Sequence, residues 1–290
     1  MDTLLLSIGF GLVTASVLAI AGVGLSLQFG VTNFVNFAYG DYATLGAYIA
    51  LLLNTRGVSI YLSMVVGGVT VGIFAVIMNR ILFQRLIARK AKLLTLLIVT
   101  IGLSLVMQNG IQSLWGPSFQ TYQAGTPTSV TVGPFLLTDQ QLVIIGVAIA
   151  CMLGVHVILR YTRIGKAMRA MSDSRDLAEI SGIDTVRVTD ITWLLAGFLA
   201  GIAGVVFAIN VATFTPVLGS EFLFLIFAAV ILGGIGKPYG AILGALVIGI
   251  STEVAGIYID TAYAYAIAFL LMIVILYVRP QGLFATKGKA

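Results

Sequence analysis

Histidine, cysteine and charge are all scarce in this chain, and each scarcity excludes a class of protein. One histidine and one cysteine occur in 290 residues, which excludes a two-histidine metal site and an internal disulfide. Charged residues make up 9% of the chain and hydrophobic residues 59%, whereas a soluble domain carries about 25% charged residues. The composition predicts an integral membrane protein. Its spans should be helices, because lipid offers the backbone no hydrogen-bond partner.

Sets of residues typical of catalysis or nucleotide binding are also missing. Residues 236–238 superficially resemble a phosphate-binding loop, but the pattern needs glycine where Ile231 stands and Ser or Thr where Pro238 stands, so we expect no ATP binding. The acidic residues are dispersed, which argues against a Mg²⁺ site. We predict no catalytic residues, no metal and no cofactor. The net charge of +5 is assigned to loops at the membrane surface, so no nucleic-acid partner is expected.

Uncharged stretches long enough to cross a bilayer follow one another along the chain. A helical span takes about 20 apolar residues. We place spans at roughly 5–29, 33–53, 59–79, 93–114, 139–159, 190–210, 220–235, 240–257 and 262–278. The sequence thus predicts an all-α polytopic helix bundle of about nine (eight to ten) transmembrane segments in one domain over residues 1–290. Residues 30–42 and 220–258 are either ordinary helix pairs or broken, re-entrant elements.

The distribution of lysine and arginine predicts the orientation in the membrane. Nine spans place the basic segments on a common face, at 80–92, 160–187, 237 and 279–289, and leave only Arg56 on the other. Basic loops favour the cytoplasm, so we expect the N-terminus outside and the C-terminus in the cytoplasm. The long external loop at 115–138 is either a plain connector or a surface that receives a partner from outside.

The cytoplasmic loop at 160–190 predicts a short docking helix. It holds six of the sixteen Lys and Arg and five of the eleven Asp and Glu. Asp173 suits an N-cap, residues 174–181 give about two helical turns, and Gly182 suits the end of the helix. Leu177 and Ile180, three residues apart, offer an apolar pair on one face. Because so short a helix is marginal alone in water, the pair predicts packing against a cytoplasmic partner.

A polar cluster interrupts the apolar sequence between the first two expected spans. It consists of Asn33, Asn36, Tyr39 and Asp41. Polar groups at membrane depth are costly and usually functional, and amides with helix N-termini can bind the two charged ends of a zwitterion. We treat these four as candidate solute-pathway residues. The alternative is that they only cap the second helix, with Asp41 near its positive end.

Four segments, in order, resemble the permease subunits of bacterial ATP-binding-cassette (ABC) importers of the branched-chain amino acid type (LivH-like). They are residues 30–48, 162–184, 233–245 and 279–284, and the likeness covers nearly the whole chain. The resemblance implies a multi-pass protein of the bacterial plasma (inner) membrane, embedded in lipid and paired with a second permease subunit, identical or different. It further implies two cytoplasmic ATPase subunits and an external substrate-binding protein. The chain itself would not be an enzyme, because ATP hydrolysis in its partners drives the inward transport of branched-chain or other neutral amino acids.

The resemblance also places the ATPase contact on the predicted short helix. The implied coupling residues are Asp173, Asp176, Leu177, Ala178, Glu179, Ile180, Gly182 and Ile183. Importer loops commonly carry Glu-Ala-Ala, three residues and Gly, and here the Ala178-to-Gly182 spacing is kept while Asp and Leu replace the first two residues. Tyr39 stands where the family usually has His, which leaves the solute open. Alternatives are an importer of urea or amides in the same family, or an ion-coupled secondary transporter relying on Asp41 and Glu253.

Overall fold

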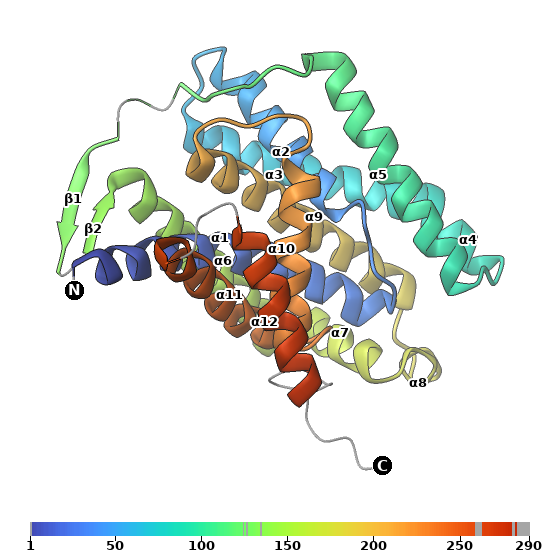
Figure 1. Cartoon of the computed structure of the whole chain (residues 1–290). Helices are drawn as coiled ribbons and strands as arrows, with labels where there is room; N and C mark the ends of the chain where they lie inside the picture. Colours follow the sequence, from blue (N-terminus) through green and yellow to red (C-terminus); the bar gives the residue numbers. More distant parts are fainter. Residues whose placement is uncertain are drawn as a thin grey trace. The chain divides into compact units, whose positions relative to one another are not determined.

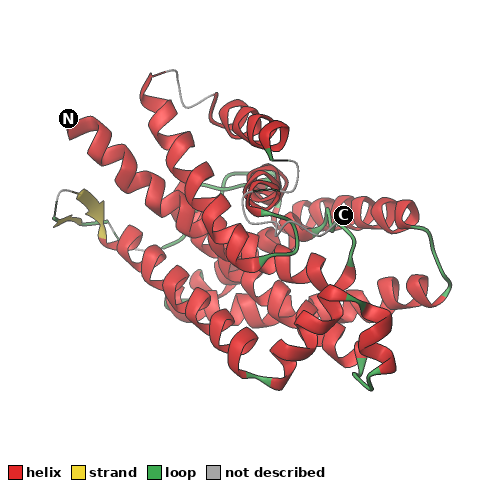
Figure 2. Ribbon diagram, turned by 90° about the horizontal axis from the view of Figure 1, so that it is seen from below, coloured by secondary structure: helices red, strands yellow, loops and turns green. Residues whose placement is uncertain are grey.

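The computed structural model describes residues 2–123, 125, 127–133, 135–258, 263–279 and 282 of the chain. Helices form almost all of this part, with one small β-hairpin (Figure 2). Up to residue 161 the elements are α1 (Asp2–Thr32), α2 (Tyr39–Asn54), α3 (Ile60–Met78), the π-helix η1 (Asn79–Phe83), α4 (Gln84–Ala88), α5 (Leu93–Trp115), β1 (Ser129–Val132), β2 (Phe135–Thr138) and α6 (Asp139–Tyr161). They are followed by α7 (Arg163–Asp173), α8 (Arg175–Ile180), α9 (Thr185–Val211), α10 (Leu218–Gly233), α11 (Pro238–Tyr258) and α12 (Ala264–Val278).

Helix lengths confirm the all-α polytopic prediction. Within the described residues, six helical segments are long and apolar enough to cross a membrane: Leu4–Thr32, Ile60–Ala88, Leu93–Trp115, Asp139–Tyr161, Thr185–Val211 and Pro238–Gly256. Two shorter apolar helices, Leu218–Gly233 and Ala266–Val278, and the 16-residue α2 correspond to the remaining expected spans. The expected second, seventh and ninth spans are thus present as helices that are shorter than a full bilayer crossing.

Contacts within the chain group into two compact units. The first comprises Met1–Ser26, Gly125–Met152 and Phe224–Ala290, and the second comprises Leu27–Ala124 and Leu153–Leu223. Helices α1, α6 and α10 each pass from one unit into the other. The second unit contains both regions that the sequence singled out, the polar break near residue 36 and the α7–α8 loop.

Helices α2, α3 and α9 lie side by side in the second unit (Figure 1) and approach closely at glycines. A Cβ atom added to Gly46 would lie 2.5 Å from the Gly201 Cα, and one added to Gly201 would lie 2.8 Å from the Gly68 Cα. No side chain fits at such distances, so backbone packs directly on backbone. Small residues permit this approach between membrane helices, where water expulsion contributes little to association.

Pairs of glycines four residues apart in the sequence lie at these contacts between helices. Gly68 and Gly72 of α3 face the segment of α9 around Leu194 and Phe198, and Gly197 of α9 faces Ala75. In the first unit, Gly244 of α11 packs against α10. These pairs therefore serve contacts inside this chain.

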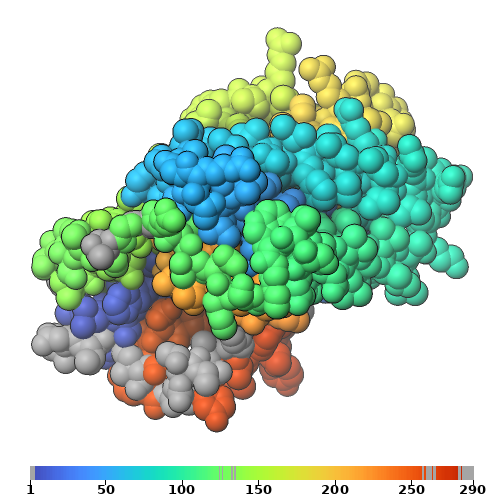
Figure 3. Space-filling model, turned by 90° about the horizontal axis from the view of Figure 1, so that it is seen from above, coloured from blue at the N-terminus to red at the C-terminus, as the bar shows by residue number. Residues whose placement is uncertain are grey.

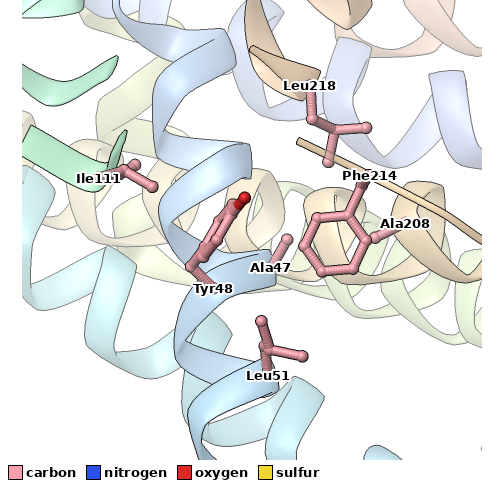
Figure 4. Close-up of a cluster of buried hydrophobic side chains, with 7 residues drawn as sticks. All are labelled: Ala47, Tyr48, Leu51, Ile111, Ala208, Phe214 and Leu218. Atoms are coloured by element: carbon pink, nitrogen blue, oxygen red, sulfur yellow. The ribbon is translucent and has the colours of Figure 1, made fainter. Parts of the chain in front are cut away.

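A hydrophobic cluster closes one end of the three-helix layer (Figure 4). Its buried members are Ala47, Tyr48, Leu51, Ile111, Ala208, Phe214 and Leu218. The Tyr48 ring meets Trp115 and Phe214 edge-on at centroid distances of 5.3 and 5.4 Å. Such edge-to-face pairs add to the burial of apolar area. The cluster joins α2, α5 and α9 to the start of α10.

The outer surface of the second unit keeps the apolar character of a membrane protein. Figure 3 shows the segment from α2 to α5 in colours that run from blue through cyan to green. Leu62 and Ile73 of α3, and Leu94 and Val106 of α5, are exposed. Apolar side chains exposed along spanning helices suit contact with lipid tails.

The segment 115–138 contains more structure than the loop that the sequence predicts for it. In the second unit, Tyr122 donates a hydrogen bond from its hydroxyl to the Ala47 carbonyl at 2.9 Å, and the Gln123 N–H donates to Asn54 Oδ1 at 2.7 Å. Gln120 pairs with Phe214 in an isolated bridge. In the first unit, β1 and β2 pair as an antiparallel hairpin with Ser129 opposite Thr138. Residues 124, 126 and 134 of this segment lie outside the described residues.

The first unit packs the N-terminal part of α1 against α11. A Cβ on Gly11 would lie 2.7 Å from the Ile250 Cα, and Thr14 Oγ1 donates to Glu253 Oε1 at 2.8 Å. Helices α10 and α11 are joined by a glycine-rich turn, where Gly234 and Gly236 have positive φ. Apart from Arg279 and Gly282, the C-terminal signature 279–284 lies outside the described residues.

We expect Gly201→Val to destabilise the second unit, because the added side chain would meet the backbone of Gly68. Overpacking of this kind costs about 1–3 kcal/mol, so the melting temperature of the purified protein in detergent should fall by about 5 °C. Gly102→Val on α5, where a Cβ meets nothing within 4 Å, is the matched control and should melt like wild type. Equal melting temperatures for the two variants would contradict the packing argument.

Candidate functional site

Two neighbouring helices, α7 and α8, form the loop that the sequence marked for docking. Thr162 caps α7, since its Oγ1 accepts a hydrogen bond from the Gly165 N–H at 3.0 Å. Met168 and Met171 are buried, while the Arg169 guanidinium donates to the Leu159 carbonyl at the end of α6. This helix was not foreseen from the sequence, and it packs against α8.

The cap of α8 differs from the one predicted. Asp173 is the last residue of α7, and Ser174 is the N-cap, with its Oγ accepting from the Leu177 N–H at 3.4 Å. The Ser174 N–H itself donates to the Ala170 carbonyl at 3.0 Å. Ser174 is therefore both the C-cap of α7 and the N-cap of α8. Asp173 was a reasonable candidate by residue type, but the continuation of α7 places its backbone inside a helix.

The end of α8 confirms the predicted role of Gly182. Gly182 has φ +82°, its N–H donates to the Glu179 carbonyl at 3.0 Å, and the Ile183 N–H donates to the Ala178 carbonyl at 3.0 Å. These two bonds define a Schellman motif, in which a left-handed glycine reverses the chain. The Ala178-to-Gly182 spacing therefore has a structural reason, because both residues occupy set positions of the motif.

Most of the predicted coupling residues are exposed. The Leu177 and Ile180 side chains are 66% and 84% exposed, and Ala178 is buried against the rest of the unit. Asp173, Asp176, Glu179 and Gly182 are also exposed, and Ile183 is half-buried. The helix thus presents two large apolar side chains to solvent from a backbone that is fixed at both ends.

The polar break between α1 and α2 lies at residues 33–38. Helix α1 ends where Asn33 adopts φ +58° and its N–H donates to the Phe29 carbonyl at 2.8 Å. Asparagine tolerates this left-handed conformation better than most residues. The Asn33 side chain is exposed, so the structure separates it from the other three candidates.

Asn36 organises the start of α2. Its Oδ1 accepts from the Ala38 N–H at 3.1 Å, and its Nδ2 donates to Gln28 Oε1 of α1 at 3.4 Å. Ala38 provides no side-chain cap of its own. The buried Asn36 amide thus satisfies a backbone donor that the helix would otherwise leave free, as an N-cap side chain does.

Tyr39 and Asp41 are buried in the first turn of α2. The Tyr39 hydroxyl donates to the Ala196 carbonyl of α9 at 3.3 Å, and Asp41 has the Ser104 side chain of α5 as a hydrogen-bond partner. Asp41 Oδ1 and Gln28 Nε2 are buried with no hydrogen-bond partner among the described residues. Five further buried side-chain atoms in the described residues also lack a partner, and water can satisfy such atoms.

Sequence reasoning missed Gln28 because it stands inside the first apolar stretch. Gln28 is uncharged and lies eight residues before Asn36, so its sequence position did not indicate that the two side chains meet. The structure shows their hydrogen bond. The position of Gln28 at membrane depth was the available clue. No group of three or more His, Cys, Asp or Glu side chains that could hold a metal ion occurs in the described part of the chain.

Comparison with protein families identifies the chain. The family model described as "Branched-chain amino acid transport system / permease component" matches residues 7–276. The chain belongs to this family. As a member it is a permease component of the ABC transporter class and not an enzyme itself, in agreement with the resemblance seen in the four sequence segments.

Individual relatives align over most of this permease. It is 28% identical to the high-affinity branched-chain amino acid transport system permease protein LivH of Escherichia coli, over 94% of this chain and 92% of the relative. It is 29% identical to the probable branched-chain amino acid transport permease protein LivH of Methanocaldococcus jannaschii, over 96% and 91%. The ribose import permease protein RbsC of E. coli is 24% identical over 81% and 73%. Sequence likeness alone therefore leaves the solute undecided.

Replacing Asn36 should destabilise the permease more than replacing an asparagine on a helix surface. Asn36→Ala leaves the buried Ala38 N–H without its acceptor, which costs about 1–3 kcal/mol. Asn109→Ala is the control, because Asn109 is exposed and donates to the Leu105 carbonyl of its own helix. Thermal unfolding of the two purified variants in detergent measures the difference, and equal melting would refute the capping role.

Proposed function

We propose that this permease moves neutral amino acids, branched-chain ones included, into the cell as the membrane subunit of an ABC importer. Its partners are a second permease subunit (a copy of itself or a different chain), two cytoplasmic ATPase subunits and an external substrate-binding protein. The proposal draws support from family membership and from the names of its most similar relatives. The protein resides in the bacterial plasma (inner) membrane.

The proposed orientation has the N-terminus outside and the C-terminus in the cytoplasm. This sidedness puts α4, with its neighbouring basic residues, on the cytoplasmic face together with α7 and α8. It puts the segment 115–138 on the external face, where the binding protein docks. The asymmetry of lysine and arginine between the two sets of loops supports this assignment, and nine crossings, with α2, α10 and α12 included, satisfy it.

The observation that carries the coupling proposal is the exposed apolar pair of α8. Leu177 and Ile180 project from a six-residue helix held by the Ser174 cap and the Gly182 reversal. Large apolar side chains on a rigid, protruding element are suited to a pocket on a partner. We assign the ATPase contact to the segment 173–183, with Asp176 and Glu179 on its polar rim.

The proposed solute pathway runs by the break between α1 and α2. Asn33, Asn36, Tyr39 and Asp41 are its candidate residues. Asp41 Oδ1 and Gln28 Nε2, which have no partner within the described residues, offer an acceptor for an ammonium group and a donor for a carboxylate. A group at membrane depth that is left ready to hydrogen-bond is better suited to a passing zwitterion than to packing.

Reconstitution of the complete transporter tests this function. Proteoliposomes with both permease subunits, the ATPases and the binding protein should accumulate radiolabelled leucine only when ATP reaches the ATPase side. Asp41→Asn should lower that uptake by about ten-fold at unchanged complex assembly, since it removes the charge that attracts the ammonium group. Uptake driven by a sodium or proton gradient without ATP would refute the importer. ATP-dependent uptake of urea or ribose in place of leucine would replace only the solute class.

Polar substitutions on α8 should detach the ATPase subunits. Leu177→Asp and Ile180→Asp should each reduce the ATPase that copurifies with the permease by about ten-fold or more, because loss of a central apolar contact costs about 2 kcal/mol or more. Val186→Asp, an exposed valine on α9 outside the segment, is the matched control and should bind normally. Full copurification with both α8 variants would remove the contact from this helix.

A further inference from the structure

One carboxylate in the second unit gathers donors from three side chains of a neighbouring helix. Asp190 lies in α9 and is buried, with its side chain 9% exposed. Its Oδ1 accepts from Asn79 Nδ2 at 2.9 Å and from Gln84 Nε2 at 2.8 Å. Its Oδ2 accepts from Arg80 Nε at 2.9 Å and from Arg80 Nη2 at 2.8 Å. Every donor comes from one stretch, the π-helix η1 and the residue that follows it.

The π-helix explains how three side chains reach one carboxylate. In an α-helix, residues five apart point about 140° away from each other, since each residue turns about 100°. In η1 the Gln84 N–H donates to the Asn79 carbonyl, five residues earlier, so the wider turn brings these two residues into line. Both amides then reach the same oxygen. Single π-turns are rare and frequently occur at functional sites.

Packed aromatic rings connect the Asp190 cluster (Asp190 with Asn79, Arg80 and Gln84) to the polar break. Phe83, the last residue of η1, stacks on Trp193 of α9 with ring centroids 5.0 Å apart. Phe83 also stacks on Phe34, which lies in the break, at 5.3 Å, and the Phe34 and Trp193 rings are 6.4 Å apart, so the three rings form one cluster. All three rings are buried. Close-packed rings cannot slide independently, so a shift of α9 moves Phe34 with it.

Asp190 is also close to α8 along the chain. A four-residue turn, 181–184, separates α8 from α9, and Asp184 caps α9 by accepting from the Arg187 N–H at 2.9 Å. Asp190 follows less than two helical turns later. A displacement of α8 thus reaches Asp190 through a capped, rigid helix end.

We propose that Asp190 is a positioning residue for energy coupling. It fastens η1 to α9, so that movement of α8 is delivered through Phe83 to the break where α2 begins. Arg80, Asn79 and Gln84 hold the carboxylate, and Phe83, Trp193 and Phe34 carry the displacement onward. The proposal rests on the proposed docking of ATPase subunits at α8.

The test compares solute moved per ATP hydrolysed in the complete transporter, with leucine as the probe. Asp190→Asn keeps the shape of the side chain but removes the charge and turns an amide towards the donors. We expect leucine transported per ATP to fall by about ten-fold, while ATPase binding and ATP hydrolysis stay within about two-fold of wild type. Arg80→Gln should act alike, and the double variant should be no worse than either single one, as coupling between the two residues requires.

Asp184→Asn is the matched control, because Asn caps a helix as well as Asp does and Asp184 contacts none of the three donors in the structure. It should keep the wild-type ratio. A merely structural role for Asp190 would reduce assembly and leave the ratio of the assembled complexes unchanged, which would overturn the proposal. If Asp190→Asn does not assemble, Phe83→Leu decides in its place, since it breaks the stack but keeps an apolar side chain. An unchanged ratio in that variant would equally overturn it.

These outcomes are separable from a failure of the importer itself. If the wild-type complex shows no ATP-dependent uptake, or Leu177→Asp and Ile180→Asp bind ATPase normally, the proposed function fails. If wild type transports leucine and Asp190→Asn transports as much per ATP, only the role of Asp190 fails.

Discussion

Direct backbone contact between α2, α3 and α9 is the constraint on which the second unit depends. In lipid the association of helices draws on close packing more than on expulsion of water. The glycines at 46, 68 and 201 let three helices approach until a single Cβ would collide. That layer holds Tyr39 and Trp193 in buried positions and fixes where the break, the π-helix and the hydrophobic cluster can lie.

Two buried polar side chains of the second unit, Asn36 and Asp190, each hold neighbouring segments by hydrogen bonds. Asn36 replaces the backbone acceptor that α2 lacks at its start, and Asp190 gathers amides and a guanidinium around a buried charge. A buried charge is tolerated only when it is paired and hydrogen-bonded. By contrast, Asp41 Oδ1 and Gln28 Nε2 have no such partner among the described residues. At Asp190 both carboxylate oxygens accept hydrogen bonds, although Asn79 Oδ1 and Trp193 Nε1 near it also lack a partner among the described residues.

Several features of the fold and the candidate site could be predicted because they depend on local chemistry. The end of α8 at Gly182 follows from the left-handed conformation that glycine adopts easily. The exposure of Leu177 and Ile180 follows from their spacing on a short helix. The N-cap was predicted one residue early, because α7, in which Met168 and Met171 are buried, extends through Asp173. Asn33 and Asn36 looked alike in the sequence, yet one ends a helix facing outward and the other is buried.

The sequence by itself determined that the chain is a helical membrane protein with a charged loop at 160–190, because hydrophobicity, charge and turn residues act over a few neighbouring positions. The resemblance to the family was also visible in the sequence, in four local segments. Only the tertiary structure decided which glycines face each other, which amide reaches Gln28, and that Arg80, Asn79 and Gln84 converge on Asp190. Most of these contacts join residues more than a hundred positions apart, such as Gly46 and Gly201 or Asn79 and Asp190. In addition, a π-turn rotates the donors by an amount that no α-helical spacing predicts.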